Sequence, residues 1–181
     1  LDYVSDMLHI MGSFIVSSIR RRNLLRQLER MSYRDQLTQF GNRYAVDWFV
    51  EHEWNGEQIG VVYCDITGLK KVNDEQGHEA GDRLIIRACE CLAGVFKGYG
   101  LYRIGGDEFL VLCLGIEEKD LREHVEKLHM DMKEHQVTMA VGMIWKEHGP
   151  KDIDLLLNES ERLMYEDKDR YYNCLLYTSP S

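Results

Sequence analysis

The feature that most constrains this fold is the run IGVVYCDI at positions 59–66. The run has no alternation of polar and apolar residues, and its one charged residue, Asp65, stands next to its end. Such a run predicts a strand buried on both faces, at the centre of a sheet. Other elements must then cover each face, and the carboxylate of Asp65 needs a partner or a ligand, because an unpaired buried charge is costly.

The chain around this run alternates between strand and helix patterns. Strands are expected at 101–104, 108–114 and 137–145, and helices at 81–96, 121–132 and 153–168. Gly105-Gly106, between two of these strands, predicts a two-residue hairpin turn. A hairpin beside strands that are joined through helices indicates an α/β (α+β) fold, with a mixed sheet covered by helices.

Residues 1–34 are predicted to form a separate N-terminal helix. Apolar residues recur at heptad spacing at Val4, Leu8, Met11, Ile15 and Leu25. The same seam passes through Ser18 and Arg22, so a coiled coil would be imperfect. Either the helix packs on its own domain, or it is a signalling connector that dimerises. The arginines at 20–22 favour the connector, because they make the middle of the helix too polar for a core.

Residues 35–173 are expected to form the main domain. The last segment, 174–181, continues none of the preceding periodicity and is interpreted as a non-native tail, with a short native tail as the alternative.

Composition and charge exclude several classes of function. A net charge of −9 and a pI near 5.3 argue against a protein that binds nucleic acid. No apolar run reaches the roughly 18 residues that span a bilayer, and no signal peptide is visible, so no direct membrane insertion of this segment is expected. The five cysteines have no metal-binding spacing. They indicate a reducing, cytoplasmic location, which leaves room for a membrane anchor elsewhere in a longer protein.

Two acidic positions offer chemistry. Asp65 lies at the end of the buried strand, and Asp107-Glu108 directly follows the glycine pair. Carboxylates that strands bring side by side repel unless a cation separates them, and oxygen ligands suit Mg²⁺ or Mn²⁺. Glycines beside them let a phosphate group approach the backbone. The alternative, a glycine hairpin with solvated acids, is the commoner case when such a segment stands alone.

Five motifs stand in order along the chain. They are DQLTQFGNR at 35–43, DITGLKKVND at 65–74, GHEAGD at 77–82, RIGGDEF at 103–109 and MYEDK at 164–168. Together they cover about residues 32–173 and resemble the signature segments of the GGDEF family, the diguanylate cyclases. The resemblance implies a fold like that of nucleotidyl cyclases and polymerase palm domains, with a mainly antiparallel sheet surrounded by helices. It also implies condensation of two GTP molecules into cyclic di-GMP, with release of two pyrophosphates.

The resemblance implies a role for each matching residue. The implied metal ligands, for two Mg²⁺ (or Mn²⁺) ions per active site, are Asp65, Asp107, Glu108 and the carbonyl of Ile66. The implied substrate-binding residues are Asn73 and Asp82 at the guanine, Lys70 and Lys168 at the phosphates, and Leu69, Gly105 and Gly106 beside the nucleotide. The three acids would be catalytic, and Glu108 would assist either the metal or the ribose 3′-hydroxyl. An acid at position 82 suits guanine, because guanine presents N–H donors where adenine presents an acceptor.

Several positions depart from the family pattern, among them Thr67, Leu69 and Tyr172. Thr67 replaces a second acid, and Leu69 replaces a common phenylalanine, which is a change of packing. Tyr172 stands where many members have an arginine, so one phosphate-binding group is missing. This last change is expected to weaken GTP binding.

The implied reaction needs two domains that face each other, because each active site holds one GTP. A homodimer is therefore expected, regulated through the N-terminal helix by an upstream sensory module that this chain lacks. The principal alternative is a catalytically silent regulatory module that binds GTP or cyclic di-GMP. A different nucleotidyl cyclase of the same fold is a third interpretation, which Asn73 and Asp82 disfavour as guanine-reading residues.

Overall fold

A computed structural model describes residues 2–31 and 33–178, and the chain divides into two compact units, Leu1–Tyr33 and Arg34–Ser181. The first unit is the helix α1 (Asp2–Met31), which confirms the helix predicted there. Its described side chains, at 7–25 and 28, are all exposed and include large apolar residues such as Leu8 and Ile15. Val4, the first residue of the predicted seam, lies outside the described side chains. No described helix is long and apolar enough to cross a membrane.

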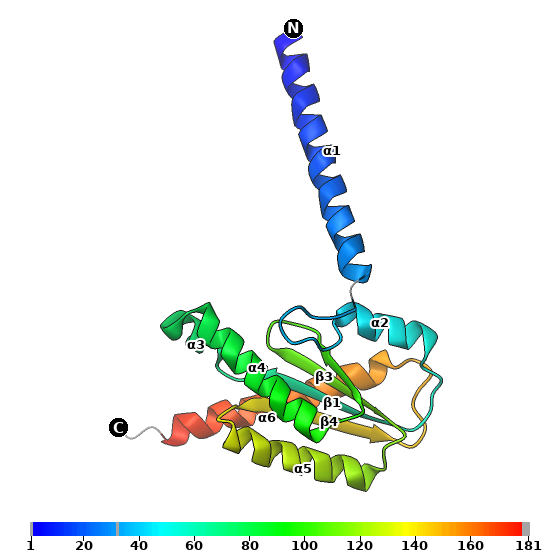
Figure 1. The fold of residues 1–181 in the computed structure, drawn as a ribbon, viewed down its shortest axis with the longest axis vertical. Helices are drawn as coiled ribbons and strands as arrows, with labels where there is room; N and C mark the ends of the chain where they lie inside the picture. The colour runs from blue at the N-terminus through cyan, green and yellow to red at the C-terminus, as the bar shows by residue number, and fades with distance from the viewer. Residues whose placement is uncertain (1, 32, 179–181) are drawn as a thin grey trace. The chain divides into compact units, whose positions relative to one another are not determined.

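The second unit is built on a four-stranded sheet. Its strands are β1 (Ile59–Ile66), β2 (Gly100–Arg103), β3 (Glu108–Leu114) and β4 (Met139–Lys146), in the order β2-β3-β1-β4 (Figure 1). Every neighbouring pair is antiparallel. The mainly antiparallel sheet is therefore confirmed, and the parallel pairing among the described residues is an isolated bridge between Gly41 and Tyr102.

The central strand β1 is buried along its whole length. Its alternate side chains belong to two separate hydrophobic clusters, with Val62 and Cys64 in one and Val61 and Tyr63 in the other. Both faces of the strand are thus covered, which explains why the run in the sequence shows no polar alternation.

Helices cover both faces of the sheet. They are α2 (Arg43–His52), α3 (Leu69–Gln76), α4 (His78–Val95), α5 (Glu118–Glu134) and α6 (Asp154–Thr178). Residues of α4 and α5 pack in the cluster of Val62, and residues of α2 and α6 in that of Val61; Figure 1 shows α4 and α5 in front of the sheet and α6 behind it. The sequence patterns predicted α4, α5 and α6 but missed α2 and α3. Helix α6 also continues past its predicted end and includes residues 174–178 of the segment interpreted as a tail.

The turn between β2 and β3 corrects the prediction of a two-residue hairpin. The connection comprises residues 104–107, and neither Gly105 nor Gly106 has a positive φ angle. A two-residue hairpin turn would need a positive φ at one or both of its central residues. The wider loop is held by the side chain of Arg103, which donates hydrogen bonds of 2.7 and 3.3 Å to the carbonyl oxygen of Gly106.

Helix α6 crosses β4 at very short range. A Cβ atom at Gly142 on β4 would collide with the carbonyl oxygen of Ser160 and the backbone nitrogen of Met164 on α6. The absence of a side chain at Gly142 lets the helix lie directly on the strand. The next turn of α6 then carries Lys168 to the end of β1, where it contacts Asp65.

Candidate active site

The acidic residues meet at the end of the central strand. Asp65 on β1 and Glu108 on β3 are directly paired in the antiparallel ladder, so their side chains leave the same face of the sheet. Asp107 precedes Glu108 in the loop, and its carbonyl oxygen accepts a hydrogen bond of 2.9 Å from the backbone N–H of Ile66. Strand pairing thus joins two motifs that are far apart in the sequence.

Lys168 on α6 forms an ion pair with Asp65. Its Nζ lies 2.7 Å from Asp65 Oδ1, and the Asp65 side chain is only 6% exposed. Apart from this ammonium group, no donor reaches that buried oxygen within the described part of the chain. Burial raises the pKa of Asp65 and Asp107 adds to the effect, against the opposing influence of Lys168. Partial burial acts to lower the pKa of Lys168, but its hydrogen bond to Asp65, together with the negative charges of Asp65 and Asp107, outweighs burial and raises the pKa.

Glu108 lies in the same repulsive environment. Burial raises the pKa of Glu108, and the charges of Asp107, Asp65 and Glu161 raise it further, whereas a hydrogen bond from Tyr63 acts to lower it. Carboxylates that disfavour each other's charge in this way are stabilised by a bound cation.

The acids fit a hard divalent cation that a substrate helps to bind. Among the residues described, no three His, Cys, Asp or Glu side chains form a ready-made metal cluster. Mg²⁺ usually keeps several water ligands and binds through one or two carboxylates together with substrate phosphates. The buried oxygen of Asp65, next to Asp107, is a partial donor set of this kind.

A cleft of about 480 Å³ opens beside the acids. The predicted site residues that line it are Ile66, Leu69, Lys70, Asp107 and Lys168. Tyr172 also lines the cleft, at the position where many family members have an arginine. Leu69 is largely buried in the core and forms part of the wall. Lys70, Lys71 and Lys168 supply positive charge to which phosphate groups would be attracted, and the carboxylates of Asp74, Glu75 and Asp107 also line the cleft.

Asn73 and Asp82 lie on the α3–α4 hairpin and are not among the residues that line this cleft. A Cβ atom at Gly81 would collide with Oδ1 of Asn73, so the Asn73 amide covers the residue that precedes Asp82. The structure thus brings these two predicted residues close to each other. Helix α3 also supplies Lys70 and Asp74 to the lining of the cleft, so the pair belongs to a hairpin that borders the cleft.

The two glycines of the signature loop have different neighbours. A Cβ atom at Gly105 would collide with the carboxylate of Glu108, whereas a Cβ atom at Gly106 would meet no atom within 4 Å. A side chain at position 105 would therefore have to displace the Glu108 carboxylate. No described residue requires a glycine at position 106, where the free space is open to a ligand.

An ion pair between residues of two different motifs supports the signature loop. Arg103 Nη1 lies 3.1 Å from Asp35 Oδ1, with the two side chains 13% and 24% exposed. Asp35 also accepts hydrogen bonds of 2.9 and 2.7 Å from the backbone N–H and the hydroxyl of Thr38. Partial burial acts to raise the pKa of Asp35, but the bonds from Thr38 and Arg103 outweigh it and lower the pKa. Both residues stand in signature motifs, yet no local spacing indicates that positions 35 and 103 meet.

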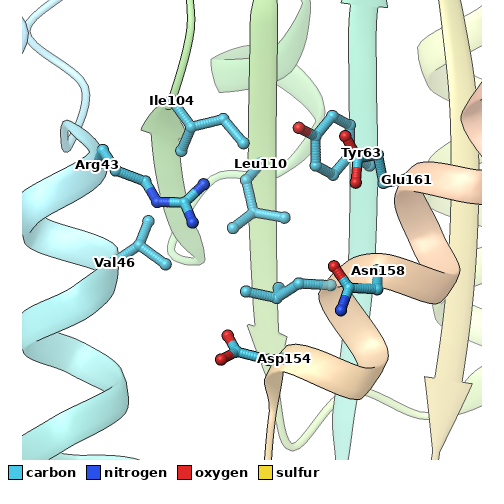
Figure 2. A pocket seen from close by; sticks show the side chains of 9 residues that line it. Arg43, Val46, Tyr63, Ile104, Leu110, Asp154, Asn158 and Glu161 are labelled. Atoms are coloured by element: carbon cyan, nitrogen blue, oxygen red, sulfur yellow. The ribbon is translucent and has the colours of Figure 1, made fainter.

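A smaller cavity of about 250 Å³ lies between α2 and α6, on the face of the sheet that carries Tyr63 and Glu108. Figure 2 shows polar side chains that approach it from the two helices: Arg43, Asp154, Asn158 and Glu161. Tyr63 and Glu161 connect this cavity to the acids, because both influence the charge of Glu108. Neither residue was expected at the site from the sequence, since no motif contains them.

The sheet, the flanking helices and the acidic loop define a domain of the nucleotidyl-cyclase type. Residues 32–174 match the family described as "Diguanylate cyclase, GGDEF domain". The chain belongs to the GGDEF family, which confirms the resemblance seen in its motifs.

Solved GGDEF domains share this fold. The coiled coil and GGDEF domain of DgcB from Caulobacter crescentus, in complex with c-di-GMP, matches with a TM-score of 0.68 and 20% identity over 88% of this chain and 92% of that one. The diguanylate cyclase SiaD from Pseudomonas aeruginosa, in complex with its activator SiaC, also gives 0.68 and 20% identity, over 93% of this chain and 72% of that one. Because both sequence identities are only 20%, these matches establish a shared fold and nothing about activity or ligands.

Relatives in sequence connect the chain with cyclic di-GMP signalling. An uncharacterized protein in the hutH 5′ region of Streptomyces griseus is 34% identical over 61% of this chain and 49% of that protein. In Escherichia coli, diguanylate cyclase DgcP is 28% identical (90% of this chain, 54% of DgcP), and cyclic di-GMP phosphodiesterase PdeR is 29% identical (87% and 25%). The chain thus spans about half or less of the length of these relatives, whose names include both synthesis and degradation of the dinucleotide.

Proposed function

We propose that this chain is an active diguanylate cyclase, which joins two GTP molecules into cyclic di-GMP and releases two pyrophosphates. The observation that carries the proposal is the meeting of Asp65 with Glu108 and Asp107, next to a cleft that Lys168 also lines. Asp65, Asp107 and Glu108 are all present. Their presence favours catalysis, because a regulatory domain without catalytic activity would not need them.

The chemistry follows from where charge develops. Attack of a ribose 3′-oxygen on an α-phosphorus builds negative charge on the attacking, equatorial and leaving oxygens. Two Mg²⁺ (or Mn²⁺) ions, held by the three acids and the carbonyl of Ile66, would supply compensating positive charge there. Lys70 and Lys168 bind phosphate oxygens in the cleft. Glu108 either completes the metal site or receives the proton of the 3′-hydroxyl, a role that its raised pKa favours.

Base selection belongs to the α3–α4 hairpin. The carboxylate of Asp82 accepts hydrogen bonds from the N1–H and N2–H groups of guanine, and Asn73 binds the same edge of the base. Adenine presents an acceptor at N1, which would face the carboxylate without a proton between them. ATP is therefore a poor substrate.

Two chains are needed for one product. Each domain holds a single GTP, so a homodimer must bring the two nucleotides together, and the apolar side chains of α1 provide a surface for association. An upstream sensory module would act through this helix. The reaction belongs in the cytoplasm, where GTP is available and the buried free cysteines stay reduced.

The test is product analysis after incubation of the purified full chain with GTP and Mg²⁺. We expect cyclic di-GMP and pyrophosphate, no comparable product from ATP, and none after chelation of the metal. Asp107→Ala should reduce the rate by at least about a hundredfold. Asp120→Ala, at an exposed acid on α5, is the matched control and should keep full activity.

The second candidate function is a silent module that binds GTP or cyclic di-GMP. The observation in its favour is Tyr172, which lines the cleft in place of a phosphate-binding arginine. Tight nucleotide binding without turnover, even when the chains are dimerised by a fused zipper, would favour this function over catalysis.

A further inference from the structure

A cavity of about 510 Å³ lies between α5, α6 and the start of β4, outside the site described above. Asp167, Arg170 and Tyr171 of α6 line this cavity, whereas Lys168 and Tyr172 line the acid cleft, so the two sites use different faces of the helix. The volume falls within the range of about 300–1,000 Å³ that is typical of small-molecule sites. Its floor is apolar and nearly inaccessible, and it consists of Met132, Val137, Met139 and Ala140.

The cavity contains a polar group that lacks a partner. Thr67 lines it, and the Oγ1 atom of Thr67 is buried without a hydrogen bond in the described structure. The backbone N–H of Thr67 is paired separately, with the carbonyl oxygen of Thr138 at 2.9 Å. Because this oxygen is buried, the Thr67 side chain would have to rotate for a ligand in the cavity to reach it. Buried hydroxyl groups are nearly always hydrogen-bonded, so such a contact would satisfy this one. Thr67 is also the position where the family usually has an acid, and the proposed reaction gives it no role.

The charges around the cavity favour an anion. Arg170 pairs with Asp167 at 3.3 Å, and Asp167 also accepts a hydrogen bond of 3.0 Å from the backbone N–H of Val141. Lys133 has no ion-pair partner among the residues described, and His129 lies beside it in the lining. One net positive charge therefore remains here, on a chain whose net charge is −9. A single negative charge is the complement, and a doubly charged phosphate would exceed it.

We propose that this cavity binds a small monocarboxylate with an aromatic or aliphatic body. The apolar floor contacts the body of the ligand, Lys133 and Arg170 bind its carboxylate, and the hydroxyl of Thr67 donates to one of its oxygens. The cavity adjoins the acid cleft in sequence, because its lining residues Thr67 and Tyr171 precede the cleft residues Gly68 and Tyr172. A nucleotide in the cleft could therefore affect binding in the cavity, so the test is done without nucleotide. Its result is then independent of whether the chain is a cyclase.

Calorimetric titration of the full chain with three matched probes tests the proposal. Indole-3-acetate, indole-3-acetamide and tryptamine have the same ring and carry a negative, a neutral and a positive group. We expect indole-3-acetate to bind at least about tenfold more tightly than the other two, because charge-assisted hydrogen bonds to the carboxylate add to the apolar contact. Amide resonance shifts should locate the binding at Thr67, Met139 and Tyr171. Equal affinity for the three probes would overturn the proposal.

Two variants with a matched control test the assigned residues. Lys133→Glu should weaken indole-3-acetate about tenfold or more, whereas Lys127→Glu, the same change at another exposed position of α5 outside the cavity, should not. Thr67→Val keeps the shape of the side chain and removes the unpartnered hydroxyl. It should raise the Tm of the free protein and weaken the probe several-fold. Equal effects of the two lysine variants, or unchanged binding by Thr67→Val, would contradict the assignment.

Discussion

Gly105 and Gly106 adjoin each other in the signature loop, but different neighbours constrain them. A side chain at Gly105 would displace the carboxylate of Glu108, whereas one at Gly106 would enter open space. Neither residue has a positive φ, so the backbone itself tolerates alanine at both positions. One added methyl group can therefore separate a packing role from a role in ligand approach.

We expect Gly106→Ala to leave the free energy of unfolding within about 0.5 kcal/mol of wild type and to lower kcat/KM for GTP about tenfold or more. The methyl group would occupy space that the nucleotide needs. Gly105→Ala should instead reduce the free energy of unfolding by about 1–2 kcal/mol, because Glu108 must move. Urea unfolding and initial rates measure both effects. Full activity of Gly106→Ala would show that no ligand approaches the backbone there.

Asp35 makes part of the stability depend on pH. Its folded-state pKa is lowered, so its contribution is complete above its unfolded-state value and is lost as the pH falls through the folded-state value. Asp35→Asn should cost about 1 kcal/mol at pH 7, because the charged partner of Arg103 is removed. The two proteins should converge in stability as the pH falls through the lowered folded-state pKa and the wild-type carboxyl becomes protonated. Urea unfolding of both proteins at a series of pH values measures this convergence. If the difference in their free energies of unfolding did not change with pH, the charge of Asp35 would be excluded as its cause.

Among the secondary-structure elements, α6 connects packing with chemistry. It lies against β4 at Gly142, and one turn after Met164 it presents Lys168 to Asp65. The backbone atoms that a side chain at Gly142 would meet cannot rotate away, unlike the end of a flexible side chain. The position of Lys168 therefore depends on a glycine in another element.

Gly142→Ala should lower the free energy of unfolding by about 2–4 kcal/mol, because α6 must move away from the sheet. Activity of the remaining folded protein should also fall, since Lys168 would leave Asp65. Gly94→Ala is the matched control: its Cβ atom would lie 3.7 Å from Asp131 Oδ2, at an exposed position of α4. That change should be neutral or stabilise by about 0.5–1 kcal/mol, as helical alanine does relative to glycine. Thermal and urea unfolding of both variants would reveal whether the two glycines differ as expected.

For the whole molecule, we expect the exposed apolar side chains of α1 to determine how the proposed activity depends on protein concentration. Leu8→Glu combined with Ile15→Glu should weaken dimerisation at least about tenfold, because the charges would enter the predicted seam. Specific activity should then fall at low protein concentration and recover at high concentration. His9→Glu combined with Ser17→Glu, at exposed positions off that seam, is the control. Sedimentation velocity and reaction rates over a dilution series measure both double variants. If the seam variant and the control variant dimerised equally well, the predicted seam would be rejected.

The local sequence was sufficient to predict those elements whose hydrophobic pattern is compatible with only one kind of secondary structure. The apolar run of β1 can be satisfied only by two covered faces, and α4 and α5 show periodic apolar stripes. Helix α3 was missed because it buries a single residue, Leu69, and a short helix without an apolar stripe leaves no periodic signal. Five ordered motifs were sufficient to identify the family and the candidate acids, whose roles stay predictions.

The tertiary structure alone decided which of these residues meet. The pairing of Asp65 with Glu108 depends on strand register, and the contacts of Lys168 with Asp65 and of Arg103 with Asp35 depend on how distant segments pack. The same packing replaced the two-residue turn expected from Gly105-Gly106, because Arg103 holds a wider loop. Periodicity and motif spacing report on neighbours along the chain, whereas contacts between distant residues appear only once the sheet has formed and the helices have covered it.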